Sequence, residues 1–402
     1  MVCRVVTALI LFLLAVTGQA AAQDAAPSAD VPVDADSGED APAPPLRGLQ
    51  LIDVDRQNDA LSIDGADADT PVTAAPSGQS SVAEIFDQAQ LAYATGEFET
   101  AYIHARTAAS GGHARAATLA GLLNENGQIE AASDAQAVRW YRRAADQNEP
   151  VALYRLGGMA QASRGSLLPN EARTYFQRSA QAGNIDAMLA YALILKASPV
   201  PQDAPLAMEW AERAASQGDA EAMFQLAQMH DVWERGPQNP EAARQWYVRA
   251  AEANHAEAAL QAGLMANSGE GGAEEAALAF DLIRQSAEAG FAPAMGQYGL
   301  MLHAGGPDRE PDPVLAAEWF AQGAVGGDAE SRYLYALALA TGDGVDRDLV
   351  RSYYWTLMAE YEMDGSLSAN TDRTRLQAQL ENYLSQTEAE QIRSEIAAYR
   401  AR

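Results

Sequence analysis

The chain has 402 residues and a formal net charge of −28, because 55 acidic side chains outnumber 27 basic ones. Its arginines are scattered along the sequence and form no stripes, which argues against binding to nucleic acid or to anionic membrane surfaces, since both need clustered positive charge. This charge is compatible with solubility and with cationic or neutral partners.

Residues 1–22 predict a signal peptide that is cleaved near Ala22. Arg4 supplies positive charge, residues 5–16 form an apolar core too short for a comfortable membrane span, and residues 20–22 are the small residues that signal peptidase needs. An uncleaved membrane anchor is the alternative. Cleavage would export the mature chain, so we expect it to be periplasmic or secreted. Cys3 is the only cysteine and would be removed with the signal peptide, so the mature chain should have no disulfides or thiol chemistry.

Residues 23–80 predict a disordered acidic leader. The segment is rich in Ala, Pro, Asp, Ser and Gly, and its 12 acids and 2 arginines give it a net charge of −10. Such a chain cannot bury enough apolar surface to offset the entropy that it would lose on ordering. We expect a tether or spacer, in which the more apolar island from Leu46 to Val54 is either a docking segment or a chance cluster.

Between residues 81 and 365 the sequence repeats itself. The clearest copy runs from Leu206 to Ala227 and reads as the end of one helix, a glycine turn and the start of the next helix. The copies align on the second residue of an Ala-Ala pair, called the anchor here, at intervals of 35 to 37 residues. The anchors are Ala109, Ala145, Ala180, Ala215, Ala251, Ala287, Ala324 and Ala359. A period this constant predicts a solenoid.

Three positions keep step with the anchor, and packing explains each of them. The third residue after it is Gly or Asn, which adopt the left-handed backbone of a helix C-cap most easily. The twelfth is Gly or Ala, which indicates the close approach of two helices. The fifth residue before the anchor is mostly aromatic, as at Trp140, Trp246 and Tyr354, and we expect it to fill the space between helices.

Polar residues predict where second helices begin. Asn170, Asn239, Asp312 and Asp348 are expected to be N-caps, two of them followed by a proline that suits the first helical position. Beyond the last unit, residues 366–402 predict two amphipathic helices, broken near Ser385, that cap the end of the solenoid.

The pattern resembles the Sel1-like repeat, a relative of the tetratricopeptide repeat, over about seven tenths of the chain. The last copy carries Gly342-Asp-Gly-Val-Asp-Arg-Asp348, and another carries Trp246-Tyr-Val-Arg-Ala-Ala251, as the family does. The loops at residues 159–170 and 196–205 lack the family's Gly-x-Gly-Val element. The resemblance implies an all-α fold, an α/α solenoid of about eight helix-turn-helix units in a right-handed superhelix.

No catalytic residue, cofactor or metal site is expected. His113 and His255 share one repeat position in units far apart, and no His-Glu-x-x-His motif occurs. Residues 343–348 lack the distant Glu of a calcium loop, and residues 269–272 lack a phosphate-binding Lys after the glycines. A Gly-x-Ser-x-Gly elbow is also absent from the sequence.

The surface most apt for binding is the concave one, which the first helix of each unit lines in related arrays. We expect the ninth and tenth residues after the anchor to face away from the core, where aromatic rings and amides can grip a peptide or a partner helix. These residues include Tyr154, Arg155, Phe224, Gln225, Gln261, Gln297 and Tyr333. Packing between repeats is the alternative explanation for them.

The sequence therefore predicts a non-catalytic, periplasmic protein-interaction scaffold or adaptor. Exported proteins with Sel1-like repeats include regulators of membrane sensors, so the resemblance implies a regulatory role. Others have been linked to β-lactam binding, which leaves an enzyme or binder acting on cell-wall material as the alternative. A structural envelope component is a third possibility.

Overall fold

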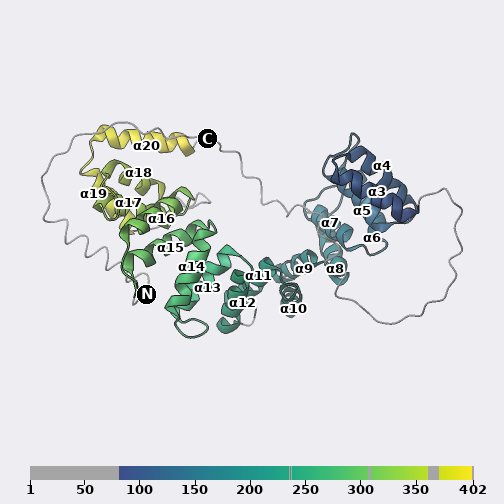
Figure 1. Cartoon of the computed structure of the whole chain (residues 1–402), viewed down its shortest axis with the longest axis horizontal. Coiled ribbons are helices and arrows are strands. Elements are labelled where there is room, and N and C mark those ends of the chain that lie inside the picture. The colour runs from purple at the N-terminus through teal and green to yellow at the C-terminus, as the bar shows by residue number, and fades with distance from the viewer. Residues whose placement is uncertain (1–80, 235, 237, 307–308, 361–370, 401–402) are drawn as a thin grey trace. The chain divides into compact units, whose positions relative to one another are not determined.

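The computed structural model describes residues 81–402 except residues 235, 237, 307–308, 361–370 and 401–402 (Figure 1). The predicted signal peptide, the acidic leader and its apolar island lie outside the described residues. Within the described part, the chain is built from helices and turns, and its one β interaction is an isolated bridge between Gly306 and Arg309.

Helices follow one another in antiparallel pairs, each made of a first and a second helix. The first helices are α3 (Val82–Ala94), α5 (Ala114–Glu125), α7 (Pro150–Gln161), α9 (Ile185–Ala197), α11 (Ala220–Asp231), α13 (Ala256–Ser268), α15 (Ala292–Ala304) and α17 (Ala329–Thr341). The second helices are α4 (Phe98–Ser110), α6 (Asp134–Ala145), α8 (Ala172–Gln181), α10 (Asp203–Ser216), α12 (Pro240–Glu252), α14 (Ala276–Glu288), α16 (Pro313–Val325) and α18 (Leu349–Met358). Each helix packs against the one before it and the one after it, so the fold is the predicted all-α solenoid.

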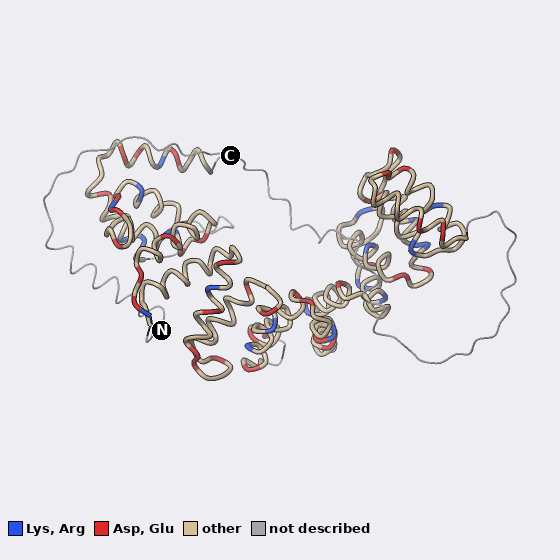
Figure 2. The backbone as a smooth tube through the Cα atoms, in the orientation of Figure 1, with Lys and Arg blue, Asp and Glu red and all other residues tan. Residues whose placement is uncertain are grey.

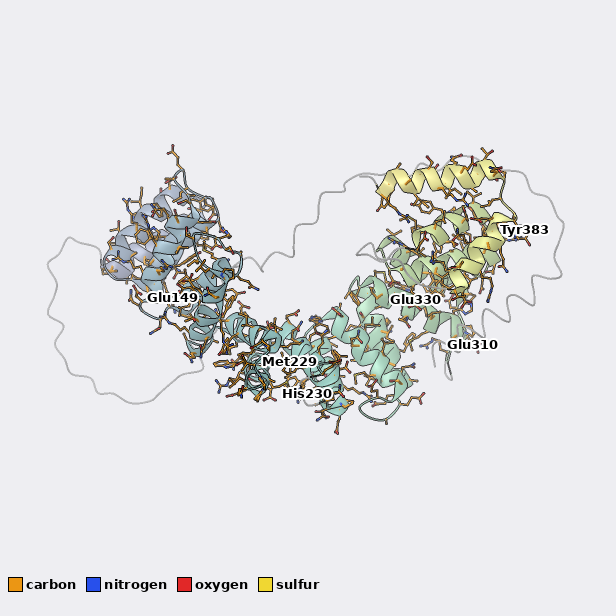
Figure 3. All side chains as sticks on the ribbon, turned by 180° about the vertical axis from the view of Figure 1, so that it is seen from behind. Glu149, Met229, His230, Glu310, Glu330 and Tyr383 are labelled. Carbon is orange, nitrogen blue, oxygen red and sulfur yellow. The ribbon has the colours of Figure 1, made fainter. Side chains whose placement is uncertain are left out.

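Two adjacent residues shape the turn from each second helix to the next first helix. The predicted C-cap position has a positive φ throughout, from 56° at Asn148 and 64° at Asn254 to 98° at Gly112, which confirms the left-handed backbone there. The next residue is the N-cap of the following helix. Its side chain accepts a hydrogen bond from the backbone N–H three residues on in every such unit but one, over 2.7 to 3.1 Å. These N-caps are His113, Glu149 (labelled in Figure 3), Asn184, Asp219, His255 and Asp328, with Phe291 as the exception.

The Gly/Ala position is a close approach, as predicted. A Cβ atom at Gly121 would lie 2.5 Å from the ring of Tyr141, and one at Gly157 would lie 2.7 Å from the ring of Phe176. These rings are fully or almost fully buried, and they stand four residues before their anchors. The expected core position, five before the anchor, is instead half-buried at Trp140 and at Trp246. At these units the most deeply buried position is four residues before the anchor, whereas the prediction placed it five residues before.

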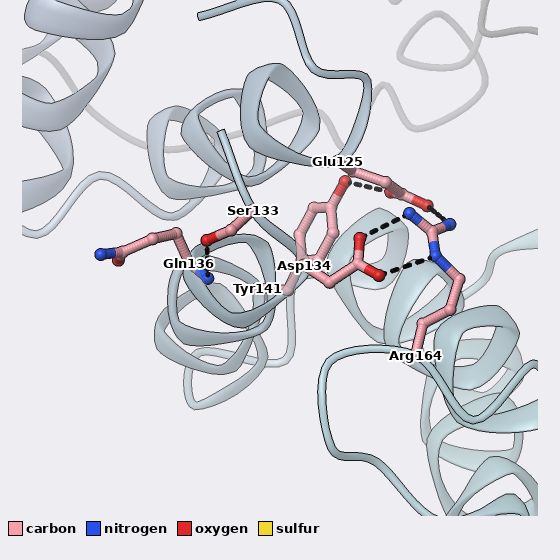
Figure 4. Close-up of polar contacts among 6 residues, drawn as sticks. All are labelled: Glu125, Ser133, Asp134, Gln136, Tyr141 and Arg164. Atoms are coloured by element: carbon pink, nitrogen blue, oxygen red, sulfur yellow. Dashed lines mark hydrogen bonds and ion pairs between the residues drawn. The ribbon is translucent and has the colours of Figure 1, made fainter. Parts of the chain in front are cut away.

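The loops that lack the Gly-x-Gly-Val element are closed by arginine. Arg164 donates to both carboxylate oxygens of Asp134, at 3.1 and 2.6 Å, and to Glu125 at 3.1 Å (Figure 4). Glu125 also accepts a hydrogen bond of 2.7 Å from the hydroxyl of Tyr141. The ion pairs thereby tie the loop after α7 to the end of α5 and the start of α6.

A second arginine holds the next such loop. Arg173 on α8 makes a bidentate pair, at 2.8 and 2.9 Å, with the buried carboxylate of Asp203 at the start of α10. The predicted N-cap at Asn170 is wrong, because this residue lies inside a short 3₁₀ helix (Pro169–Glu171) that precedes α8. The other predicted N-caps accept hydrogen bonds as expected, and Pro240 and Pro313 each occupy the first helical position.

Two helices follow the last pair. α19 (Thr371–Glu381) and α20 (Gln386–Arg400) both pack against α18, and they bury Leu376, Leu380, Ile392 and Ile396. The break between them lies at Ser385, whose side chain and backbone exchange hydrogen bonds with Glu388. The predicted end of the eighth unit falls among residues 361–370, outside the described residues.

Candidate interaction face

The ninth residue after the anchor belongs to the core, which contradicts the expected exposure of Phe224 and Tyr333. Both side chains are 4% exposed. The Phe224 ring lies 4.4 Å from the ring of His255 and 5.8 Å from that of Tyr247, measured between centroids. Tyr154, at the same position of α7, is half-buried against Phe176. These side chains are buried because this face of the first helix packs against the neighbouring unit.

The tenth residue is only partly exposed to solvent in the middle of the chain. Arg155, Gln225, Gln261 and Gln297 are all half-buried there. The amide nitrogen of Gln225 donates to Glu221 on its own helix at 2.9 Å. That of Gln297 donates to Glu330 (Figure 3), which lies on the next first helix, at 3.2 Å. The side-chain amide of Gln261 makes no hydrogen bond to any other residue that the structure describes.

Two further rows flank the glutamines. Residues six, ten and thirteen after an anchor are four and three apart, so they share one face of a helix. The sixth residue is acidic on α11, α13 and α17, and the thirteenth is a half-buried leucine on α13, α15 and α17. We call these rows on α11, α13, α15 and α17 the interaction face. It consists of Glu221, Gln225, Gln228, Glu257, Gln261, Leu264, Pro293, Gln297, Leu300, Glu330 and Leu337.

Lys and Arg, which Figure 2 marks in blue along the backbone, are unevenly distributed between the first and the second helices. The first helices carry only Arg115, Arg155, Lys196 and Arg332, and α11, α13 and α15 carry no Lys or Arg. The second helices carry Arg106, Arg139, Arg142, Arg143, Arg173, Arg178, Arg213, Arg244, Arg249, Arg284 and Arg351. Within the described helices, most arginines therefore lie on the second helix of each pair.

Many of these arginines have a structural role. Arg143 and Arg178 stand two residues before their anchors and donate to backbone carbonyls at the end of the preceding second helix, at 3.3 and 2.7 Å. Gln285 makes the same contact with Ala251 at 2.8 Å. These bonds join one unit to the one before it, so these side chains on the second helices help to stabilise the stacking of the units.

Three of the five histidines have structural explanations. Nδ1 of His113 and of His255 accepts the capping hydrogen bond of the following helix, so both rings must be unprotonated at that atom. Burial, and next the positive charge of Arg115, lower the pKa of His113 below its ordinary value. His303 contacts Asp343 at 2.6 Å. Among the described residues, no group of three or more His, Cys, Asp or Glu side chains could hold a metal ion.

Comparison with known families identifies the repeat. The model of the Sel1 repeat matches residues 114–149, 150–184, 185–219, 220–255, 292–328 and 329–360, which together make up just over half of the chain. The chain belongs to the Sel1 repeat family. The pairs α3–α4 and α13–α14 lie outside the matched segments, yet they keep the buried anchor and the left-handed C-cap. Proteins of this family generally bind other proteins and are typically non-catalytic scaffolds.

Solved structures share the fold. A Sel1 repeat protein from Oxalobacter formigenes is 27% identical and aligns over 74% of this chain and 87% of its own, with a TM-score of 0.59. The protective antigen c5321 of uropathogenic Escherichia coli strains, which displays the same repeat fold, is 18% identical over 78% of this chain and 82% of its own, with a TM-score of 0.53. Comparison with curated protein sequences finds no match. Across the described residues, no helix is long and apolar enough to cross a membrane.

Proposed function

We propose that this protein is an exported, non-catalytic scaffold that holds a partner protein on the interaction face and so regulates or assembles a component of the bacterial envelope. The observation that carries the proposal is the row formed by Gln225, Gln261 and Gln297, spaced by one repeat on three successive first helices. Other first helices have Leu119, Ala190 or Leu334 at this position. The fold therefore does not require glutamine there, and binding accounts for it.

Two further observations support this role. The interaction face combines amides, acids and leucines, which suits a protein surface with both polar and apolar contacts. The second helices use Arg143, Arg173 and Arg178 in bonds between units, as described above. The family's general activity, binding to other proteins, agrees with the same assignment.

Export rests on the predicted signal peptide at residues 1–22. It is tested by fusing residues 1–40 to alkaline phosphatase, which is active only outside the cytoplasm. The expected result is activity that is lost when Leu13 and Leu14 are both replaced by Asp. Equal activity of the two fusions would contradict export by this segment.

The interaction face is tested by photo-cross-linking in the native cells. A photoreactive residue is placed at Gln261 on α13, and at the exposed Gln322 on the second helix α16 as the matched control. The expected result is an adduct with one envelope protein at position 261 alone. The same adducts at both positions, or none at position 261, would refute the assignment of this face.

A further inference from the structure

The unused hydrogen-bonding capacity of the glutamine row shows which kind of partner it suits. Each glutamine amide can donate two hydrogen bonds and accept through its oxygen. Gln261 uses none of this capacity within the described chain, and Gln225 and Gln297 each use one donor, through Nε2. No described residue donates to the amide oxygen of any of the three. The row therefore has both donors and acceptors to offer.

An extended peptide is the partner that matches such a row. In a helix the backbone N–H and C=O groups are already paired with each other, so a docked helix could offer only side chains to the amides. An extended segment leaves its backbone groups free at every residue. An extended segment that crosses α11, α13 and α15 in turn would therefore meet one glutamine on each of these first helices.

Charge on the same face selects the side chains of the peptide. Glu221 and Glu257 precede Gln225 and Gln261 by one helical turn, and Glu330 lies within hydrogen-bonding distance of Gln297. α11, α13 and α15 carry no Lys or Arg, and Nε2 of His255 contacts Glu221 at 3.2 Å. Acids in the first turn also favour the helix dipole, but they present negative charge to any bound segment regardless of that role.

The leucine row lies on the other side of the amides. Leu264, Leu300 and Leu337 are half-buried, so part of each side chain faces solvent. Such a row gives apolar surface to the aliphatic stems of long basic side chains or to aliphatic residues. An extended segment with Lys or Arg toward the acids and aliphatic groups toward the leucines would satisfy all three rows.

We propose that the interaction face binds an extended, basic segment of a partner protein, whose backbone pairs with Gln225, Gln261 and Gln297 and whose Lys or Arg side chains meet Glu221, Glu257 and Glu330. This rests on the function proposed above and names the chemistry of the partner. The acids give the preference for basic sequences. The glutamine amides require only that the backbone N–H and C=O groups of the peptide are not already paired.

The test uses the purified protein and randomised libraries of linear peptides of several lengths. We expect the retained peptides to be enriched in Lys and Arg. Replacing the backbone N–H of the best peptide by N-methyl, one residue at a time, should weaken binding at the residues whose N–H pairs with a glutamine and leave it unchanged at the others. Retention of acidic peptides, or binding that N-methylation leaves unchanged, would overturn the proposal.

Variants of the protein make the test specific. Q261L should weaken the best peptide about tenfold, because it removes two neutral hydrogen bonds, and the protein should fold because leucine occupies the same position in α5 and α17. E257Q should weaken it about threefold at low salt and hardly at high salt. Q322L on α16 is the matched control and should bind as the natural protein does. Equal binding by Q261L and the natural protein would refute the role of the amides.

The two proposals fail differently. If cross-linking at position 261 captures an envelope protein while no basic peptide binds, the partner presents a folded or acidic surface, and only the inference about the extended segment is wrong. If position 261 captures nothing, the interaction face itself is wrong.

Discussion

Two adjacent glycines on α7 should respond in opposite ways to the same substitution. At Gly157 a Cβ atom would lie 2.7 Å from two ring carbons of Phe176, which is 3% exposed and has no room to move. At Gly158 a Cβ atom would meet nothing within 4 Å. Replacing glycine by alanine inside a helix stabilises the folded state by about 1 kcal/mol at either position. Steric overlap in a packed core costs roughly 1–3 kcal/mol, and only Gly157→Ala incurs it.

We therefore expect Gly158→Ala to raise the free energy of unfolding by about 0.5–1 kcal/mol, and Gly157→Ala to lower it by up to about 2 kcal/mol. Because the helix propensities cancel, the difference between the two variants measures the overlap alone. The assay is urea denaturation followed by far-ultraviolet circular dichroism, with the midpoint compared at equal slope.

A double-mutant cycle identifies the ring as the cause. Phe176→Leu should cost less in the Gly157→Ala background than alone, because the smaller side chain relieves the overlap. The reasoning is refuted if Gly157→Ala is as stable as Gly158→Ala, or if Phe176→Leu is equally costly in both backgrounds.

Three further outcomes are expected. Asn254→Ile should lose about 1–2 kcal/mol of unfolding free energy in denaturant, since φ is 64° there, while Asn254→Gly should be no less stable than the natural protein. Arg173→Met should lose about 1–3 kcal/mol in the same assay, because it leaves the carboxylate of Asp203 buried without its bidentate partner, and adding Asp203→Asn should recover part of the loss. The pKa of His113 is lowered in the folded state, so its contribution to stability is present above the ordinary histidine pKa of about 6.5 and is lost as the pH falls through the folded value. The melting temperature should therefore fall less in acid for His113→Asn, which caps without titrating; the same acid sensitivity in both proteins would count against the capping role.

The features that follow from local rules could be predicted from the sequence. The left-handed C-caps depend only on the backbone preference of Gly and Asn, and the period marks the units without reference to packing. The close approach at Gly121 and Gly157 was predictable because nothing larger than alanine occurs at that position. Each of these features repeats in nearly every unit, so its prediction does not depend on any single residue.

Exposure on the first helices could not be predicted as well. A first helix packs against the second helices on either side, and α15 also contacts α17, so apolar residues surround much of its circumference. Phe224 and Gln225 are neighbours in sequence, yet one is buried and the other half-buried. The glutamine recurs at one position although packing does not need an amide there, and its role in binding stays a prediction. The predicted N-cap at Asn170 was wrong because polar residues also occur inside short 3₁₀ helices, as this one does.

The turns between units have a consequence for how such a chain changes in length. At Asn254 and His255, as at most other junctions, one residue ends a helix and the next begins another, so each junction carries its own stop and start signals. The bonds from Gln285 and from Arg178 reach only the preceding unit. Recombination between gene copies at these points would add or remove a whole unit, such as residues 220–255, and leave the caps on both sides complete. Selection can thus lengthen or shorten the proposed interaction face by one first helix at a time.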